Sequence, residues 1–161
     1  MIEIRNLEKS EHTFLLKMLY ESIYLDIENK PPMDQLLNTD SMKKYYQNWG
    51  RKGDKALIAV DECGNFCGAV WYRLFCKENP GYGFVSEHIP ELGIAIEKEY
   101  RGKGLGKKLM NSIIEEAKNN GFDELSLSVD AKNSNAIQLY DKIGFIQVGR
   151  DETSLIMLYK C

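Results

Sequence analysis

The residues best suited to chemistry form one glycine-rich, basic stretch, Arg101-Gly-Lys-Gly-Leu-Gly-Lys-Lys108. Its alternating glycines let the backbone approach a ligand closely. Apolar residues at helical spacing follow, so the stretch opens a helix, where free N–H groups and the helix dipole favour an anion. Its four cations oppose the net charge of −3 of the whole chain. The stretch therefore predicts a site for an anionic ligand.

The residue types alone leave the identity of that anion open. The P-loop spacing G-x-x-x-x-G-K-[ST] is absent, because Lys107 is followed by Lys108. The dinucleotide pattern G-x-G-x-x-G is also absent, since Gly102, Gly104 and Gly106 fall at every second position. A solvated basic turn at the start of a helix is the simpler alternative.

Composition and charge argue against several classes of protein. The 161 residues predict one domain over 1–161, and 43% apolar with 11% aromatic residues predicts a folded chain. No apolar run could span a bilayer, and residues 1–5 lack the pattern of a secretion signal, so we expect no membrane partner and a cytoplasmic location. The net negative charge argues against a nucleic-acid partner. The four cysteines form no C-x-x-C pair, so no metal is expected.

The elements that must position the glycine-rich stretch alternate along the chain. The last of the predicted helices is capped by Asn133 or Ser134 and ends at Gly144. The order β-α-β-α-β-β in the second half favours an α/β fold, with helices packed on a mixed sheet. Strands are expected at 2–5, 55–60, 66–75, 91–96, 125–129, 145–148 and 154–159, helices at 10–25, 41–49, 105–119 and 133–143, and a long loop at 77–90.

Two segments resemble the GCN5-related N-acetyltransferase family. The cofactor signature of that family is Arg or Gln, two residues, Gly, one residue, then Gly or Ala, and Arg101–Gly106 matches it fully. Residues 133–145 are similar to the family's Asn-Ala-Tyr-Gly-Phe pattern, and the resemblance covers about residues 91–149. It implies a mixed, mostly antiparallel sheet of about seven strands, flanked by helices, whose fourth and fifth strands splay apart.

The resemblance also implies an acetyl-CoA site. The pantetheine arm would lie between the splayed strands and bond to the backbone of residues 94–96, and the N–H groups of residues 102–107 would hold the pyrophosphate. Asn133 would contact the pantetheine arm, and Tyr140 would lie near the thioester sulfur. The implied cofactor residues are Ile94, Ala95, Ile96, Arg101, Gly102, Lys103, Gly104, Leu105, Gly106, Lys107, Asn133 and Tyr140.

Acetyl transfer to an amine requires a neutral nucleophile, donors for the oxyanion and a leaving thiolate that can be protonated. A phenol with pKa ~10 is close enough to a thiol with pKa ~8.5 for Tyr140 to act as the general acid. An N–H near Ala95 or Ile96 could bind the oxyanion. Glu91 begins the fourth strand, where family members often carry a base. It could also be a cation-binding group or a solvated strand-end residue.

Residues before 91 are expected to select the acceptor. Glu87 and Glu91 favour a cationic acceptor, which we expect to be a small-molecule or peptide amine. Each aromatic candidate could instead be a core residue. The candidates are Tyr24, Trp71, Tyr72 and Glu87, with Trp49, Arg73 and Tyr82 as further possibilities.

Three functions follow from these residues. The first is an acetyl-CoA-dependent N-acetyltransferase, in which the amine attacks the thioester directly in a ternary complex. The second is a non-catalytic acyl-CoA sensor or interaction module on the same fold. The third is a nucleotide-phosphate module. Tyr140 and the intact glycine stretch favour the enzyme, and a homodimer is compatible with all three.

Overall fold

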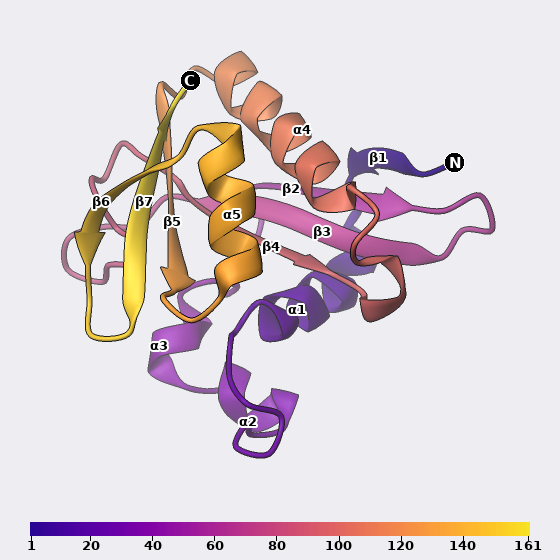
Figure 1. The fold of residues 1–161 in the computed structure, drawn as a ribbon, viewed down its shortest axis with the longest axis horizontal. Helices are drawn as coiled ribbons and strands as arrows, with labels where there is room; N and C mark the ends of the chain where they lie inside the picture. The colour runs from indigo at the N-terminus through magenta and orange to yellow at the C-terminus, as the bar shows by residue number, and fades with distance from the viewer.

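The computed structural model describes all residues, from Met1 to Cys161. Seven strands form one sheet in the order β1-β2-β3-β4-β5-β7-β6, with helices on both faces (Figure 1). The strands are β1 (Glu3–Asn6), β2 (Lys55–Val60), β3 (Phe66–Arg73), β4 (Glu91–Ile96), β5 (Glu124–Asp130), β6 (Ile146–Arg150) and β7 (Ser154–Lys160). The helices are α1 (His12–Glu21), α2 (Met33–Leu37), α3 (Asp40–Lys43), α4 (Leu105–Asn119) and α5 (Ser134–Ile143), with short 3-10 turns at Lys9–Glu11 and Lys98–Tyr100.

The two central strands of the sheet separate after a single pair. β3 and β4 pair antiparallel over six residues, and β5 and β7 over seven. In contrast, β4 and β5 run parallel and share only the pair Glu91 and Ser126, where Ser126 N donates to Pro90 O at 3.0 Å. The prediction of a mixed sheet of about seven strands with splayed fourth and fifth strands is therefore confirmed.

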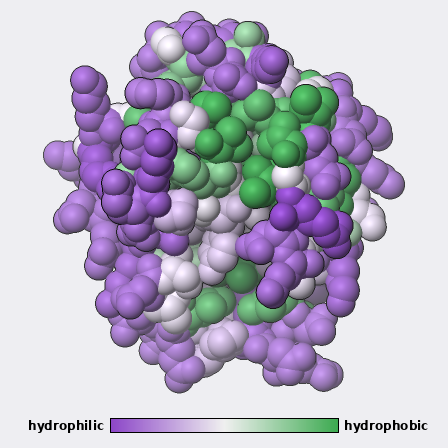
Figure 2. All heavy atoms as spheres, turned by 90° about the vertical axis from the view of Figure 1, so that its left-hand side faces the viewer, coloured by the Kyte–Doolittle hydropathy of each residue, from purple (hydrophilic) through white to green (hydrophobic).

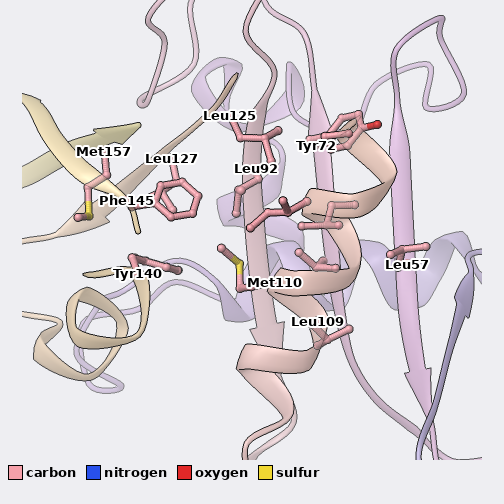
Figure 3. Packing of buried hydrophobic residues seen from close by; sticks show 14 of the residues in the cluster. Leu57, Tyr72, Leu92, Leu109, Met110, Leu125, Leu127, Tyr140, Phe145 and Met157 are labelled. Carbon is pink, nitrogen blue, oxygen red and sulfur yellow. The ribbon is translucent and has the colours of Figure 1, made fainter. Parts of the chain in front are cut away.

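The sheet divides the hydrophobic core into two clusters. One cluster lies under α4 and α5, and the other lies under α1, α2 and α3. Side chains alternate between the two faces along each strand, so Leu92 of β4 points into the first cluster and Ala95 into the second. Figure 3 shows Leu92, Leu125, Met110 of α4 and Tyr140 of α5 in the same cluster. A residue of β4 or β5 can thus be assigned to one face by its position.

The N-terminal helices differ from the predicted ones. α1 is shorter than residues 10–25, and the short helix α2 follows Pro31-Pro32, where only a break was expected. The predicted helix 41–49 stops as α3 at Lys43. Its continuation is replaced by turns, because the buried Arg73 guanidinium binds the Lys44 and Gln47 carbonyls at 3.0 and 2.8 Å. A tertiary contact here overrides the local helical pattern.

The outer edge of the sheet carries exposed apolar side chains. Ile146 and Val148 of β6 are 58% and 47% exposed, and Figure 2 shows an apolar area on this side of the molecule within a hydrophilic surround. No helix is both long and apolar enough to span a bilayer.

Candidate active site

The glycine-rich stretch forms a cradle of free amide groups at the start of α4. None of the backbone N–H groups from Gly102 to Lys107 donates a hydrogen bond within the chain; the first to do so is Lys108 N, to Gly104 O at 3.3 Å. No acidic residue lies in the first turn of this helix. Six consecutive N–H groups at a helix N-terminus make a concentrated set of anion-binding donors.

The glycines of the cradle have two different roles. Gly102 and Gly104 adopt φ of +75° and +81°, a conformation that strains side-chain-bearing residues, and nothing lies within 4 Å of a Cβ built on either. Gly106 instead lets α4 approach its neighbours, since a Cβ there would lie 3.1 Å from Leu139 Cδ2 of α5. The first two glycines keep the cradle open, and the third packs it against the core.

The charged and apolar side chains of the stretch point in different directions. Leu105 is buried and anchors the helix start in the core. Arg101 Nε donates to Ile96 O at 2.9 Å, which ties the cradle to the end of β4. Lys103 and Lys107 are exposed, with Lys103 Nζ 5.9 Å from the Tyr100 ring centre. These exposed cations add a positive field around the free amides.

The gap between β4 and β5 exposes the backbone of only some β4 residues. Glu97 N donates to Cys67 O of β3, and hydrogen bonds to one neighbour recur at every second residue of an antiparallel strand. Ala95 therefore also bonds toward β3, while Ile94 and Ile96 turn their backbone groups toward β5. This corrects the expectation that all three residues offer backbone groups to a ligand in the gap.

Tyr140 projects from α5 into the cluster beneath α4. It is 8% exposed, its ring centre lies 5.9 Å from that of Phe145, and Figure 3 shows it beside Met110. Its hydroxyl makes no hydrogen bond within the chain, and burial raises the pKa of Tyr140 to about 12. The phenol is thus protonated throughout the neutral range and free to donate.

Asn133 closes the N-terminal end of the same helix. Its Oδ1 accepts a hydrogen bond from Ala136 N at 3.4 Å, as an N-cap residue does. Its Nδ2 makes no hydrogen bond within the chain, so the amide can cap the helix and still donate to a ligand.

Glu91 lies on the opposite face of the sheet, in a nearly closed site. It is 6% exposed. Its Oε2 accepts from the Tyr45 hydroxyl at 2.7 Å, and its Oε1 accepts from Gly83 N at 2.9 Å. Burial raises the pKa of Glu91 to about 7, although both hydrogen bonds and the Lys44 cation favour the charged form. A carboxylate titrating near neutrality is suited to exchange a proton with an amine.

Tyr45 is a site residue that the sequence did not single out. Its hydroxyl donates to Glu91 and accepts from Tyr82 N at 2.7 Å, so it joins the carboxylate to the loop at 77–90. Burial, and next the negative charge of Glu91, raise the pKa of Tyr45 well above its ordinary value. A lone tyrosine in a weak helical pattern carries no signal of this role, because its partners come from distant segments.

Arg73 holds Tyr45 in place. Its guanidinium donates twice to Asp54, at 2.9 and 2.8 Å, and both side chains are almost fully buried. The same guanidinium binds the Lys44 and Gln47 carbonyls, which flank Tyr45 in the chain. Trp49 lies over it, with its ring centre 5.0 Å away. Arg73 and Trp49 therefore support the site from behind and do not face an acceptor.

The other acceptor candidates fall into two groups. Tyr72 is buried in the α4 cluster, where its hydroxyl accepts from Asn120, and Trp71 is buried against Gly93, so neither is on a ligand-accessible surface. This corrects the expectation for both residues. Tyr24 and Tyr82 are about half exposed. Glu87 accepts from Lys77 N at 3.1 Å, which closes the loop on itself.

Two clefts lie away from these residues. One, of about 560 Å³, is formed by β1, β2 and α4, and the other, of about 640 Å³, lies beside Tyr46 and Trp49. Neither includes the cradle, Tyr140 or Glu91. No group of three or more His, Cys, Asp or Glu side chains is arranged to hold a metal ion.

The separated strands connect the two halves of this site. The cradle, Tyr140 and Asn133 belong to α4 and α5, and Glu91 and Tyr45 lie across the sheet. A continuous sheet would keep them apart. Because β4 and β5 diverge beyond the pair Glu91 and Ser126, a ligand lying between these strands could reach from the cradle to Glu91.

The chain is similar in sequence and fold to known acetyltransferases. A profile of the Acetyltransferase (GNAT) family matches residues 16–145. Over 95 residues the chain is 32% identical to N-alpha-acetyltransferase 30 of Schizosaccharomyces pombe, a match that covers 59% of each protein. A GNAT-family acetyltransferase from Streptococcus pneumoniae superposes with a TM-score of 0.72 at 25% identity, over 100% of both chains. The PaiA N-acetyltransferase of Thermoplasma acidophilum, solved with coenzyme A, has a TM-score of 0.69 at 24% identity, over 100% of this chain and 99% of that one.

These matches differ in how much of each protein they cover. The matched segments span between 24% and 59% of the length of the first curated relatives. The family profile, in contrast, spans most of this chain and includes the cradle, Glu91 and Tyr140. The chain therefore belongs to the acetyltransferase (GNAT) family.

Proposed function

We propose that the protein transfers the acetyl group of acetyl-CoA to a primary amine of a small molecule or peptide. The observation that carries this proposal is the cradle of six free N–H groups together with the buried Glu91 carboxylate, which lies where β4 and β5 separate. The cradle fits a pyrophosphate, because the space above Gly102 and Gly104 is open and the surrounding side chains are basic.

The residues divide the reaction between the two faces of the sheet. On the Glu91 face, the carboxylate takes a proton from the acceptor ammonium, and the neutral nitrogen attacks the thioester carbonyl carbon. A C–N bond forms, the carbonyl electron pair moves to oxygen, and an N–H facing the gap, from Ile94 or Ile96, is placed to bind that oxyanion. The carbonyl then re-forms, the C–S bond breaks and its electron pair leaves with sulfur. The positively charged nitrogen loses its extra proton to the thiolate or to solvent, which gives the amide and the free thiol of CoA.

Tyr140 assists the departing sulfur chiefly as a hydrogen-bond donor. With a pKa of about 12, the phenol is a weaker acid than a thiol of pKa ~8.5, so full proton transfer to the thiolate is uphill. A hydrogen bond to the developing thiolate still stabilises the transition state. This assignment differs from a tyrosine of ordinary pKa, which would deliver its proton more readily.

A CoA-release assay tests the proposed function. Acetyl-CoA is incubated with a panel of amines, including a polyamine, amino acids and peptides with free N-termini, and thiol release is followed together with the mass of the product. Release that requires an amine, with an acetylated product, is expected. Binding of acetyl-CoA without release for any amine would favour the sensor, and stabilisation by ATP but not by CoA would favour a nucleotide-phosphate module.

Tyr140→Phe should lower kcat by about 10²-fold while leaving CoA affinity unchanged. The ring keeps its packing against Phe145, and only the donor is lost, so the effect lies at the lower end of the range for general acid–base groups. Turnover at saturating amine gives the rate, and calorimetry gives the CoA affinity. Tyr159→Phe is the matched control, since its ring also packs on Phe145, at 5.2 Å. Equal rates in all three proteins would remove Tyr140 from the chemistry.

A further inference from the structure

One buried polar atom beside Glu91 makes no hydrogen bond to the carboxylate or to any other group of the chain. Ser126 Oγ on β5 has no contact with solvent and no hydrogen-bond partner in the chain, and no other side-chain nitrogen or oxygen so completely buried lacks a partner. A buried hydroxyl without a partner costs roughly 1–3 kcal/mol, so such groups are usually matched by a ligand or an ordered water. Ser126 therefore points to a binding partner outside the chain.

The position of Ser126 ties it to Glu91. The two residues form the only pair between β4 and β5, at the point where these strands separate. Leu125, Leu127 and Val129 face the α4 cluster, so Ser126 faces the other side of the sheet, as Glu91 does. Adjacent strands lie about 4.8 Å apart, which is close enough for one water molecule to bridge the hydroxyl and the carboxylate.

The loop at residues 81–83 packs against Glu91 and β5. A Cβ on Gly81 would lie against Glu91 Oε1, and a Cβ on Gly83 would lie 2.6 Å from the Leu127 carbonyl carbon. The loop backbone at 81–83 thus rests directly on both the carboxylate and β5. Ser126 is 0% exposed and Glu91 is 6% exposed, so a water molecule between their side chains would be shielded from bulk solvent.

We propose that Ser126 is a positioning residue, whose hydroxyl and the Glu91 carboxylate together hold the water that passes the acceptor's proton to Glu91. This inference rests on the proposed function. In the step itself, the ammonium N–H bond breaks, the water accepts that proton and gives one of its own to a Glu91 oxygen. The hydroxyl of Ser126 keeps its proton and fixes the orientation of the water. No co-reactant is consumed.

Other groups around the carboxylate do not replace this hydroxyl. Tyr45 and Gly83 each already donate to one carboxylate oxygen, and Lys44 donates to Pro80 O at 2.6 Å. Arg73 of β3 lies opposite Glu91 of β4 in the strand register. Its guanidinium is fully engaged with Asp54 and with the Lys44 and Gln47 carbonyls. Among the side-chain atoms that are completely buried, only Ser126 Oγ has no hydrogen-bond partner.

Kinetics of matched variants test the proposal. Ser126→Ala should lower kcat about tenfold, the effect of one lost hydrogen bond, with acceptor KM unchanged. Ser126→Thr keeps the hydroxyl in a residue suited to strands and should stay near the wild-type rate. Ser128→Ala, on the same face of β5, is the control and should have no effect. In a Glu91→Gln background, adding Ser126→Ala should lower kcat no further, because both changes interrupt one path.

A second measurement does not depend on turnover. The infrared carboxylate band of Glu91, assigned by its absence in Glu91→Gln, is followed against pH. Ser126→Ala should raise the midpoint, because a hydrogen bond that favours the charged form is lost, whereas Ser126→Thr and Ser128→Ala should leave it in place.

Three results separate the outcomes. An unchanged kcat together with an unchanged midpoint would overturn the proposal and make Ser126 a packing residue. Losses that multiply in the double variant would also overturn it, since Ser126 and Glu91 would then act separately. If the wild type released no CoA with any amine, the proposed function would fail, while the infrared titration would still decide whether Ser126 and Glu91 are linked.

Discussion

Glu91→Gln should lower kcat by roughly 10²–10⁴-fold near neutral pH, the range typical of a lost general base. In the wild type the rate should rise with pH through about 7, where the carboxylate forms, and then level off. The glutamine of the variant keeps the size of the side chain but cannot lose a proton, so the variant should lack this rise near pH 7. Its rate should instead climb toward high pH, where the free amine becomes plentiful. Pre-steady-state rates from pH 5.5 to 9.5 with one responsive amine measure both profiles.

The same substitution separates catalysis from attraction of the acceptor. If Glu91 only attracts an ammonium group, acceptor KM should rise while kcat holds. Profiles and constants identical to the wild type would exclude both roles. Glu99→Gln, which removes an exposed carboxylate just after β4, is the control and should leave the profile unchanged.

Stability gives an independent check on the titration of Glu91. Its pKa is raised in the folded protein from 4.5 to about 7, so the folded state binds more protons than the unfolded state between these values. The free energy of unfolding of the wild type should therefore fall relative to that of Glu91→Gln as pH rises from 4.5 to 7, by on the order of 3 kcal/mol. Chemical denaturation at several pH values measures this difference, and parallel curves would show that the pKa is ordinary.

Gly104→Val should abolish the stabilisation of the protein by CoA. At a ligand concentration 100 times Kd, binding should stabilise the wild type by about 2.7 kcal/mol. At position 104 the φ of +81° disfavours a β-branched residue, and its side chain would enter the open space above the cradle. Thermal unfolding with and without CoA measures the loss.

A second glycine controls for backbone strain. Gly64, in the turn between β2 and β3, has φ of +85° and also has nothing within 4 Å of a built Cβ. Gly64→Val should therefore lower stability to a similar extent as Gly104→Val but keep the full response to CoA. If the Gly104 variant kept the same response, the cradle would not be the pyrophosphate site.

The local parts of the site could be predicted from the sequence. The cradle is one continuous stretch whose glycines and cations act through their own backbone, so Gly102 and Gly104 could be singled out before their φ angles were known. The strands and helices that carry Glu91 and Tyr140 follow from hydrophobic periods over long segments, which the core then satisfies.

The remaining parts depend on contacts between distant segments. Tyr45 acquires its role from Glu91, 46 residues away. Ser126 is one of two serines in an alternating strand, and only the register places it opposite Glu91. Tyr72 and Trp71 are aromatic and polar at one end, as acceptor residues often are, but strand alternation directs one into each core cluster. Residue type could not separate these cases, because burial is decided by the assembled sheet.

The single pair between β4 and β5 has a consequence for how long the protein survives in a cell. This single pair is the weakest junction in the sheet, because the neighbouring strand pairs, β3 with β4 and β5 with β7, are joined along six and seven residues. Sub-global opening follows the least stabilised boundary, and proteases cleave the opened form. A ligand lying between β4 and β5 would join the two strands as an extra strand does. Binding of such a ligand should therefore slow proteolysis of the protein, and limited proteolysis with and without CoA measures the effect.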